Sequence, residues 1–395
     1  MLFINAVLKT MEGPDIPNGY LRVKDGRIDH LGPMEAFSGP EAGEEVFDLT
    51  GKTVYPGFID AHSHLGMWED GLGDEGDDGN EDTDPTTPQL RALDAVNPTD
   101  YCFEEAVAAG VTTVLTGPGS ANPIAGEWIA MKTAGRRIDD MVISPNAGMK
   151  FALGENPKMC YHGKSQMPVT RMATAALIRE QLNKARRYQK DKELAASDDD
   201  YDEPEYDIKC EALLPVLRRE QKAFFHAHRT DDMFTAIRLA KEFQLDYVLV
   251  HGTEGYQVAD ILKEENAPVI TGPILCDRSK PELRHLTTKN AGALNRAGLP
   301  VAICTDHPVI PIQYLALSAG IAVAAGMDYQ QALRAITINP AKICGIDHLV
   351  GSLKAGKQAD LTVFQGDPLS VYSSPCLVMI DGKIYKNEVG GNPHA

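Results

Sequence analysis

Between residues 57 and 349, the sequence alternates short apolar segments with amphipathic helical patterns. This alternation predicts a parallel sheet whose strands are connected by covering helices. The segment holds about eight such repeats, which suits a closed barrel, for which ~250 residues are typical. An open, doubly wound sheet is the alternative, but no glycine-rich phosphate-binding fingerprint follows the first strand. We therefore expect an α/β fold, a (β/α)8 TIM barrel, with strands at residues 113–119, 140–147, 222–228, 247–252, 267–273 and 300–306 and helices that include residues 230–243 and 255–265.

The two ends of the chain resemble each other. Each contains alternating, strand-like runs broken by an Asp-Gly pair, Asp25-Gly26 near the start and Asp381-Gly382 near the end. Asp-Gly is typical of two-residue hairpin turns. Because neither end is long enough to form a core alone, we expect both to share one small β-sandwich domain; two unrelated hairpins are the alternative. The predicted domains are a first β-sandwich part at residues 1–56, the barrel at residues 57–349 and a second β-sandwich part at residues 350–395.

The composition limits the kinds of binding partner and the cellular compartment that we expect for this protein. The sequence has 38 Lys and Arg against 56 Asp and Glu, a net charge of −18. No basic excess is present to neutralise phosphates, which argues against nucleic acid or an anionic membrane as a partner. The seven cysteines are dispersed, as in a reduced protein, and the sequence shows neither a signal-peptide pattern nor a membrane-spanning stretch. We expect a cytoplasmic protein, and a homo-oligomer because helices outside barrels often pair.

Two acidic stretches interrupt the strand–helix alternation. The stretch at residues 197–207 is interpreted as a solvated surface loop. The stretch at residues 68–85 follows the first expected barrel strand, at the end of a barrel where loops form binding sites. It is therefore either another solvated loop or a lid that faces the substrate, in which case it could recognise a cationic group.

Histidines gather where expected strands end. His62 and His64 are two residues apart, so both imidazoles face the same side of a strand. The segment FFHAHR ends another strand, and five of the eleven histidines occupy such positions. A barrel brings the carboxyl ends of its strands into one ring, and imidazole and carboxylate are ligands that Zn²⁺ prefers. The sequence therefore predicts a metal site formed by strand-end residues, the later ones being His226, His228, His251 and Asp306.

The combination of PGFIDAHSH, the strand-end FHAH, the later strand-end histidine, TDHP and the closing GSLKAGKQADLTVF resembles the amidohydrolase superfamily across essentially the whole chain. Within it, the layout looks most like the imidazolonepropionase and proline-dipeptidase (prolidase) branches. The resemblance implies one or two divalent cations, Zn²⁺ or another metal. The metal ligands that it implies are His62, His64, His226, His251 and Asp306, with Lys150 as a carboxylated bridge between two cations. An ordinary lysine at position 150 would instead be a solvated side chain or a contact to a substrate anion.

The sequence departs from the deaminase pattern at His228, where deaminases carry a glutamate that acts as acid and base. This departure leaves His228 as a support, a substrate contact or an alternative metal ligand. Further residues expected at the barrel mouth, as candidate substrate contacts, are Arg229, Glu254, His307 and Asn156. His307 follows Asp306, and we expect it to support Asp306 rather than to bind metal.

The expected function is hydrolysis of a C–N bond in an amide, cyclic amide or peptide of a small-molecule substrate. In this hypothesis Asp306 accepts the proton of the attacking water and delivers it to the leaving nitrogen. His251 or His228 helps to hold the developing oxyanion. A metal-dependent deaminase of a heterocycle is the alternative enzyme. A catalytically silent scaffold is the alternative from another class, and metal content would separate it from both enzymes.

Overall fold

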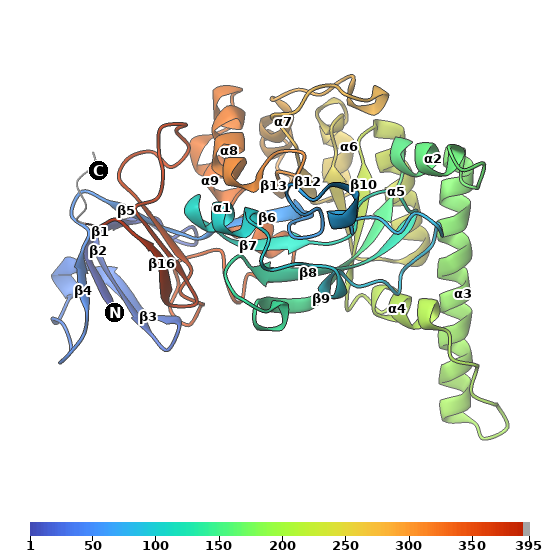
Figure 1. The fold of residues 1–395 in the computed structure, drawn as a ribbon, viewed down its shortest axis with the longest axis horizontal. Helices are drawn as coiled ribbons and strands as arrows, with labels where there is room; N and C mark the ends of the chain where they lie inside the picture. Colours follow the sequence, from blue (N-terminus) through green and yellow to red (C-terminus); the bar gives the residue numbers. More distant parts are fainter. Residues whose placement is uncertain (390–395) are drawn as a thin grey trace.

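The computed structural model describes residues 1–389, which form two eight-stranded β-sheets and ten α-helices. One sheet curves into a barrel in the middle of the molecule, and the other lies at one end of it (Figure 1). Helices cover the outside of the barrel, and the helix α3 projects beyond it (Figure 1). Within the described residues, no helix combines the length and the apolar composition needed to cross a membrane.

The barrel strands follow one another around the sheet in sequence order. They are β6 (Phe58–Ser63), β7 (Val111–Thr116), β8 (Ile124–Lys132), β9 (Val142–Ala152), β10 (Lys222–Ala227), β11 (Tyr247–His251), β12 (Val269–Thr271) and β13 (Val301–Ile303). The expected strands all lie on this list or overlap with it. The ring is nearly closed, since Asp306 N, after β13, donates to the carbonyl oxygen of His62 in β6 over 3.1 Å.

The expectation of an entirely parallel barrel is wrong for one strand. β8 runs antiparallel to both β7 and β9, while the other neighbouring strands of the sheet are parallel. The reason is the length of the connections: only residues 117–123 and 133–141 separate β8 from its neighbours. A crossover between parallel strands needs a dozen or more residues, so these short connections fix an antiparallel return.

The helices are α1 (Cys102–Ala108), α2 (Glu155–His162), α3 (Arg171–Ser197), α4 (Ile208–Leu217), α5 (Thr230–Phe243), α6 (Ala259–Glu264), α7 (Asn290–Arg296), α8 (Leu315–Ala324), α9 (Tyr329–Arg334) and α10 (Ile338–Ile343). The helix expected at residues 230–243 is α5. The helix expected at residues 255–265 divides into a 3₁₀ turn at Gly255–Gln257 followed by α6. Apolar side chains between helices and strands form the largest core cluster, and a second cluster, including Trp128 and Phe224, fills the barrel interior.

The second sheet joins both ends of the chain, as expected from their similar sequences. Its strands are β1 (Leu2–Leu8), β2 (Ile16–Lys24), β3 (Arg27–Pro33), β4 (Val46–Asp48), β5 (Thr53–Pro56), β14 (Leu361–Phe364), β15 (Leu377–Ile380) and β16 (Lys383–Asn387). β5 and β14 pair in antiparallel fashion, which places the early and late strands side by side (Figure 1). Both ends contribute to one apolar cluster, including Phe3 and Val363. The two-layer sandwich and the domain boundaries stay predictions, because the strand pairing describes one continuous sheet and residues 390–395 lie outside the described part.

A buried ion pair connects the two sheets. Lys132, the last residue of β8, contacts Asp360, which directly precedes β14, and both side chains are nearly inaccessible. Asp360 also accepts a hydrogen bond from the backbone of Asp381 over 2.9 Å. The barrel and the second sheet are thus joined by charges that water does not screen.

Candidate metal centre

Five strands bring one set of polar side chains to the carboxyl ends of the barrel. His62 lies in β6, Lys150 in β9, His226 in β10 and His251 at the end of β11, and all four are buried. His64 and Asp306 follow the ends of β6 and β13. The possible ligand atoms form two groups, and the atoms within each group lie within 4.8 Å of one another. One group is His62, His251 and Asp306, and the other is His226, His228 and His251.

The rings of His64, His226 and His251 are held by their Nδ1 atoms. The Nδ1 atoms of His64 and His251 lie 2.6 and 2.7 Å from the carbonyl oxygens of Gly117 and Gly272. Because a carbonyl only accepts hydrogen bonds, these Nδ1 atoms carry the hydrogen and the Nε2 lone pairs are left for another partner. His226 Nδ1 similarly contacts the Ser120 hydroxyl over 2.9 Å. Outer contacts of this kind orient imidazoles that ligate metals.

His228 belongs to the same cluster of rings. Its Nδ1 lies 2.7 Å from the hydroxyl of Thr253, and its ring stacks on that of His251 with 4.4 Å between centroids. A hydroxyl both donates and accepts, so the partner of His228 leaves its tautomer open. His228 Nε2 is therefore available either as a lone pair or as a donor.

The carboxylate of Asp306 lies close to both histidines of the first barrel strand and its end, His62 and His64. Its Oδ1 lies 2.9 Å from His62 Nε2 and 3.3 Å from His64 Nε2. Burial by itself would raise the pKa of Asp306, but the close contact of its carboxylate with the imidazole of His62 outweighs burial and holds that pKa well below the ordinary value. The carboxylate is thus ionised and able to accept a proton.

The imidazoles of His62, His226, His228 and His251 are neutral bases. Burial lowers the pKa values of His62, His226 and His228 well below the usual value and that of His251 to about 4. Neutral imidazole is the form that ligates a metal. The backbones of His251 and Asp306 also adopt the left-handed region, with φ of 72° and 57°. Such strain in residues other than glycine costs about 1–3 kcal/mol and gathers at functional sites.

Lys150 is fully buried at the bottom of the site. Its ammonium nitrogen has no hydrogen-bond partner within residues 1–389 and lies 4.7 Å from the ring centroid of Trp128. Burial lowers its pKa to about 7. In the parallel pairing of β9 with β10, Lys150 lies opposite Phe224, two positions before His226. A buried lysine that loses its proton near neutral pH has the nucleophilic amine that carboxylation requires.

The donor set fits a divalent cation. Buried atoms without a hydrogen-bond partner in the described part of the chain include both ring nitrogens of His62, His226 Nε2 and Lys150 Nζ. Leaving such atoms unsatisfied is costly, and native structures rarely contain several together. Nitrogen and carboxylate ligands gathered around one space satisfy this need when a cation such as Zn²⁺ is bound.

The other predicted site residues have different surroundings. Asn156 lines the cavity at the metal centre, which has a volume of about 500 Å³. Arg229 instead forms an ion pair with Asp231, and Glu254 accepts a hydrogen bond from Thr230 N at the start of α5 over 2.9 Å. The His307 ring accepts from Ile312 N over 3.2 Å, while its carbonyl oxygen accepts from His64 N.

Two residues at the site, Glu282 and Lys280, were not predicted from the sequence. Glu282, in the 3₁₀ turn Pro281–Leu283, is 1% exposed, and its Oε1 lies 3.7 and 3.6 Å from the Nε2 atoms of His226 and His228. Lys280 lines the cavity and lies 2.7 Å from the same oxygen. The only available signal was a charged loop, residues 276–284, after the seventh barrel strand, and a loop lacks the periodicity that shows which side chains face inward.

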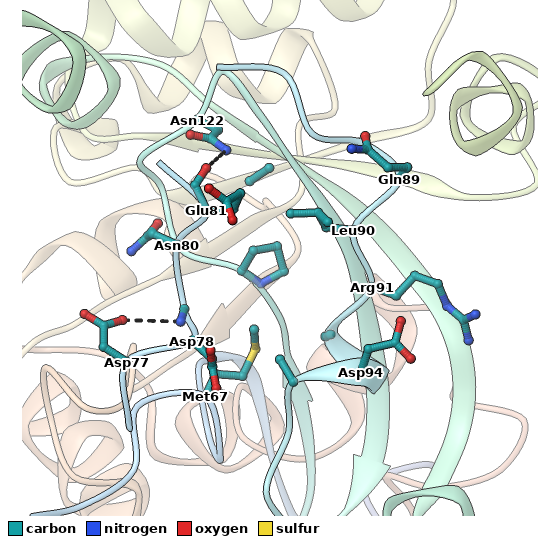
Figure 2. Close-up of a pocket in the computed structure, with 15 residues that line it drawn as sticks. Met67, Asp77, Asp78, Asn80, Glu81, Gln89, Leu90, Arg91, Asp94 and Asn122 are labelled. Atoms are coloured by element: carbon teal, nitrogen blue, oxygen red, sulfur yellow. Dashed lines mark hydrogen bonds between the residues drawn. The ribbon is translucent and has the colours of Figure 1, made fainter. Parts of the chain in front are cut away.

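The stretch at residues 68–85 contributes to the cavity wall through Trp68 and Asn80. The Trp68 ring meets the His64 ring edge to face with 4.7 Å between centroids. The acidic side chains of Asp77, Asp78 and Glu81 line a separate, neighbouring pocket of about 360 Å³ (Figure 2). The segment therefore faces the metal centre with an aromatic ring and an amide rather than with its charges.

Comparison with known proteins shows relatives in both sequence and fold. The model of the Amidohydrolase family matches residues 53–392. The crystal structure of an amidohydrolase from Thermotoga maritima MSB8 is 41% identical and covers 98% of this chain and 99% of that chain, with a TM-score of 0.93. The imidazolonepropionase of Sphingopyxis alaskensis is 24% identical over 92% of this chain and 91% of its own length.

A longer relative is amidohydrolase tasK of Hapsidospora irregularis, which is 30% identical over 89% of this chain. The chain spans 38% of the length of that relative. The family model covers most of the chain, from the start of β5 through the hairpin of β15 and β16. The chain therefore belongs to the amidohydrolase family and is an enzyme that acts on carbon–nitrogen bonds.

Proposed function

We propose that this enzyme hydrolyses the C–N bond of an amide, cyclic amide or peptide in a small-molecule substrate, in a metal-dependent reaction. The observation that carries the proposal is the convergence of histidine Nε2 atoms and the Asp306 carboxylate at one end of the barrel. The rings of His64, His226 and His251 are each oriented through Nδ1, and for His64 and His251 the carbonyl partner leaves the Nε2 lone pair for a cation.

The residues that would hold the cation are His62, His64, Lys150, His226, His251 and Asp306, with Lys150 carboxylated where two cations are bound. Zn²⁺ is the first candidate because it favours imidazole and carboxylate ligands; other divalent cations are the alternative. A bound divalent cation would supply a water of lowered pKa and polarise the substrate carbonyl. The small-molecule substrate is supported by the cavity volume of about 500 Å³, within the range of ligand sites.

Asp306 is proposed as the proton carrier. Its low pKa keeps it ionised at neutral pH, so it accepts the proton of the attacking water and returns it to the leaving nitrogen. His228 is a better candidate than His251 for donating a hydrogen bond to the developing oxyanion, because of their tautomers. His251 carries its hydrogen on Nδ1, bonded to Gly272, whereas His228 Nε2 is able to donate.

Deamination of a heterocycle is kept as the second candidate because of Glu282. Deaminases need a carboxylate acid–base near this position, and Glu282 Oε1 lies 3.6 Å from His228 Nε2 although it comes from another loop. The pairing of that oxygen with Lys280, 2.7 Å away, favours hydrolysis, because it occupies the carboxylate and leaves it less free to reach a substrate. A cytoplasmic location and a homo-oligomer stay predictions from the sequence.

The test combines metal content with a substrate panel. Protein purified without chelators is analysed for metal and assayed with dipeptides, N-acyl amino acids, hydantoin-like rings, the imidazolone ring and heterocyclic amines. Hydrolytic ring or amide opening without ammonia release supports the proposal, and ammonia release from a heterocyclic amine supports deamination. A protein that takes up no divalent metal even when reconstituted would be a scaffold, which overturns both.

A further inference from the structure

We propose that Lys280 and Asn156 form a carboxylate-binding subsite in the metal cavity, so that the substrates carry a carboxylate beside the bond to be cleaved. The inference rests on the proposed hydrolytic function and names the substrate class for it. The proposal rests on one cationic side chain and one amide that meet at the cavity wall: Lys280 directly precedes the 3₁₀ turn Pro281–Leu283, and Asn156 lies in the first turn of α2.

Lys280 is the only lysine or arginine among the described residues that line the cavity with His64, His226, His251 and Asp306. Its side chain is 28% exposed, so it is held by the protein yet open to a ligand. Two of its three hydrogens are used: Nζ lies 2.8 Å from Asn156 Oδ1 and 2.7 Å from Glu282 Oε1. The third is left for a ligand.

The contact to Lys280 also fixes the orientation of the Asn156 amide. An ammonium group only donates, so the oxygen of the amide must face Lys280 and the NH₂ group must face away from it. No hydrogen bond from Asn156 Nδ2 to another residue is found within residues 1–389. Because both residues line the cavity, the remaining ammonium hydrogen and the amide NH₂ offer two donors to the two oxygens of a carboxylate.

The subsite is held in place by a reciprocal link between the start of α2 and the 3₁₀ turn Pro281–Leu283. Glu155 N, at the start of α2, donates to Glu282 Oε2 over 2.9 Å, and Glu282 N donates to Glu155 Oε2 over 3.1 Å. Glu282 is buried, so it also anchors the Lys280 ammonium in one position. Donors positioned before the ligand arrives lose little conformational entropy on binding.

The remaining cavity wall favours the same substrate class. The acidic side chains of Asp77, Asp78 and Glu81 line the neighbouring pocket and not this cavity (Figure 2), so they do not face a bound carboxylate. Apolar surface comes instead from Trp68, Met159, Pro308 and Val309. Two hydrogen-bond donors for a carboxylate, a metal centre and apolar walls together fit N-acyl amino acids or dipeptides that have an apolar side chain.

The test compares ligands that differ only in charge. Binding of N-methanesulfonyl-L-methionine, whose sulfonamide replaces the bond to be cleaved, and of its C-terminal amide to the metal-loaded enzyme is measured by calorimetry, for wild type, Lys280→Met, Lys280→Arg and the control Lys289→Met. Lys289 is exposed, does not line the cavity and gives the same charge change. We expect wild type and the control to prefer the acid. Lys280→Met should lower this preference by about 10- to 100-fold, as expected for a lost charge-assisted hydrogen bond, and Lys280→Arg should restore part of it.

A preference for the acid that is equal in wild type and Lys280→Met overturns the inference, because the carboxylate would then bind the cation directly. Metal content and circular dichroism of each variant check that the centre is intact. If Lys280→Met does not fold, Asn156→Asp takes its place: its added carboxylate should weaken binding of the acid far more than of the amide, and equal effects overturn the inference. Binding is measured without turnover, so an enzyme that hydrolyses none of the panel refutes the proposed function separately.

Discussion

Asp306 Oδ1 lies 2.9 Å from His62 Nε2, so a residue after the last barrel strand meets a residue of the first. The backbones meet as well, because Asp306 N donates to the carbonyl oxygen of His62. Buried Asp60 strengthens the same junction, since its carboxylate accepts from His62 N over 3.1 Å and from Thr305 N over 3.0 Å. The point at which the barrel closes is therefore also the point at which the candidate ligands converge.

Replacing Asp306 by Asn should lower kcat about 10²- to 10⁴-fold, the usual contribution of a general acid–base group. The amide is isosteric, so the barrel should still fold. The measurement is steady-state hydrolysis of a substrate from the panel, with circular dichroism as a check on folding. Wild-type turnover in the Asp306→Asn variant would remove Asp306 from the mechanism.

The buried pair of Lys132 and Asp360 predicts a large loss of stability on removal of one partner. Asp360→Asn removes the buried counter-charge of the Lys132 ammonium and leaves it only the Asp381 carboxylate, 3.4 Å away and 43% exposed. This should cost about 3 kcal/mol of the free energy of unfolding, the lower end of the range for a broken buried pair. The control is Lys241→Met, which breaks the exposed pair with Glu265 and should cost less than about 1 kcal/mol. Urea unfolding of both variants gives the comparison, and equal losses would contradict the prediction.

Glu12 predicts a pH-dependent contribution to stability away from the metal centre. Burial by itself would raise its pKa, but hydrogen bonds from Ser352 over 2.7 Å and Lys357 over 2.9 Å outweigh burial and lower the pKa from 4.5 to about 2. A carboxyl whose folded pKa is depressed stabilises the protein above its unfolded pKa. That contribution is lost as the pH falls from 4.5 towards 2.

For Glu12→Gln we therefore expect a loss of about 1–2 kcal/mol at pH 6, discounted for partial exposure, that shrinks by about half at pH 3. Urea unfolding at both pH values measures it. Glu35→Gln, at an exposed residue of the same N-terminal segment, serves as the control and should change little at either pH. A loss for Glu12→Gln that is independent of pH would show that packing, and not charge, is responsible.

The strand-end histidines could be located from the sequence because two simple rules apply to them. Alternation places His62 and His64 on one face of a strand, and a barrel gathers the strand ends. The same reasoning missed β8, since an apolar run such as residues 124–132 carries no information on strand direction. The direction follows from the short connections on either side of it.

Loop side chains were harder to predict than strand residues because local partners compete for them. Arg229 was expected at the barrel mouth, but Asp231, two residues later, holds its guanidinium at 2.8 Å. Lys280 and Glu282 lie at the metal centre although nothing in their spacing distinguishes them from nearby charged residues such as Arg278. Their position depends on the conformation of the loop, which the link to Glu155 fixes.

Lys150→Met tests how many cations the centre holds. If Lys150 is carboxylated and bridges two cations, wild-type protein should contain about two equivalents of divalent metal per chain and the variant one or fewer. The bridge adds a negative charge and two oxygens to a site that otherwise has a single acidic ligand, Asp306. Elemental analysis of protein purified without chelators measures this, with Lys158→Met in α2 as the control of equal charge change. One equivalent in both wild type and Lys150→Met would contradict the bridge and leave Lys150 as a contact to the substrate.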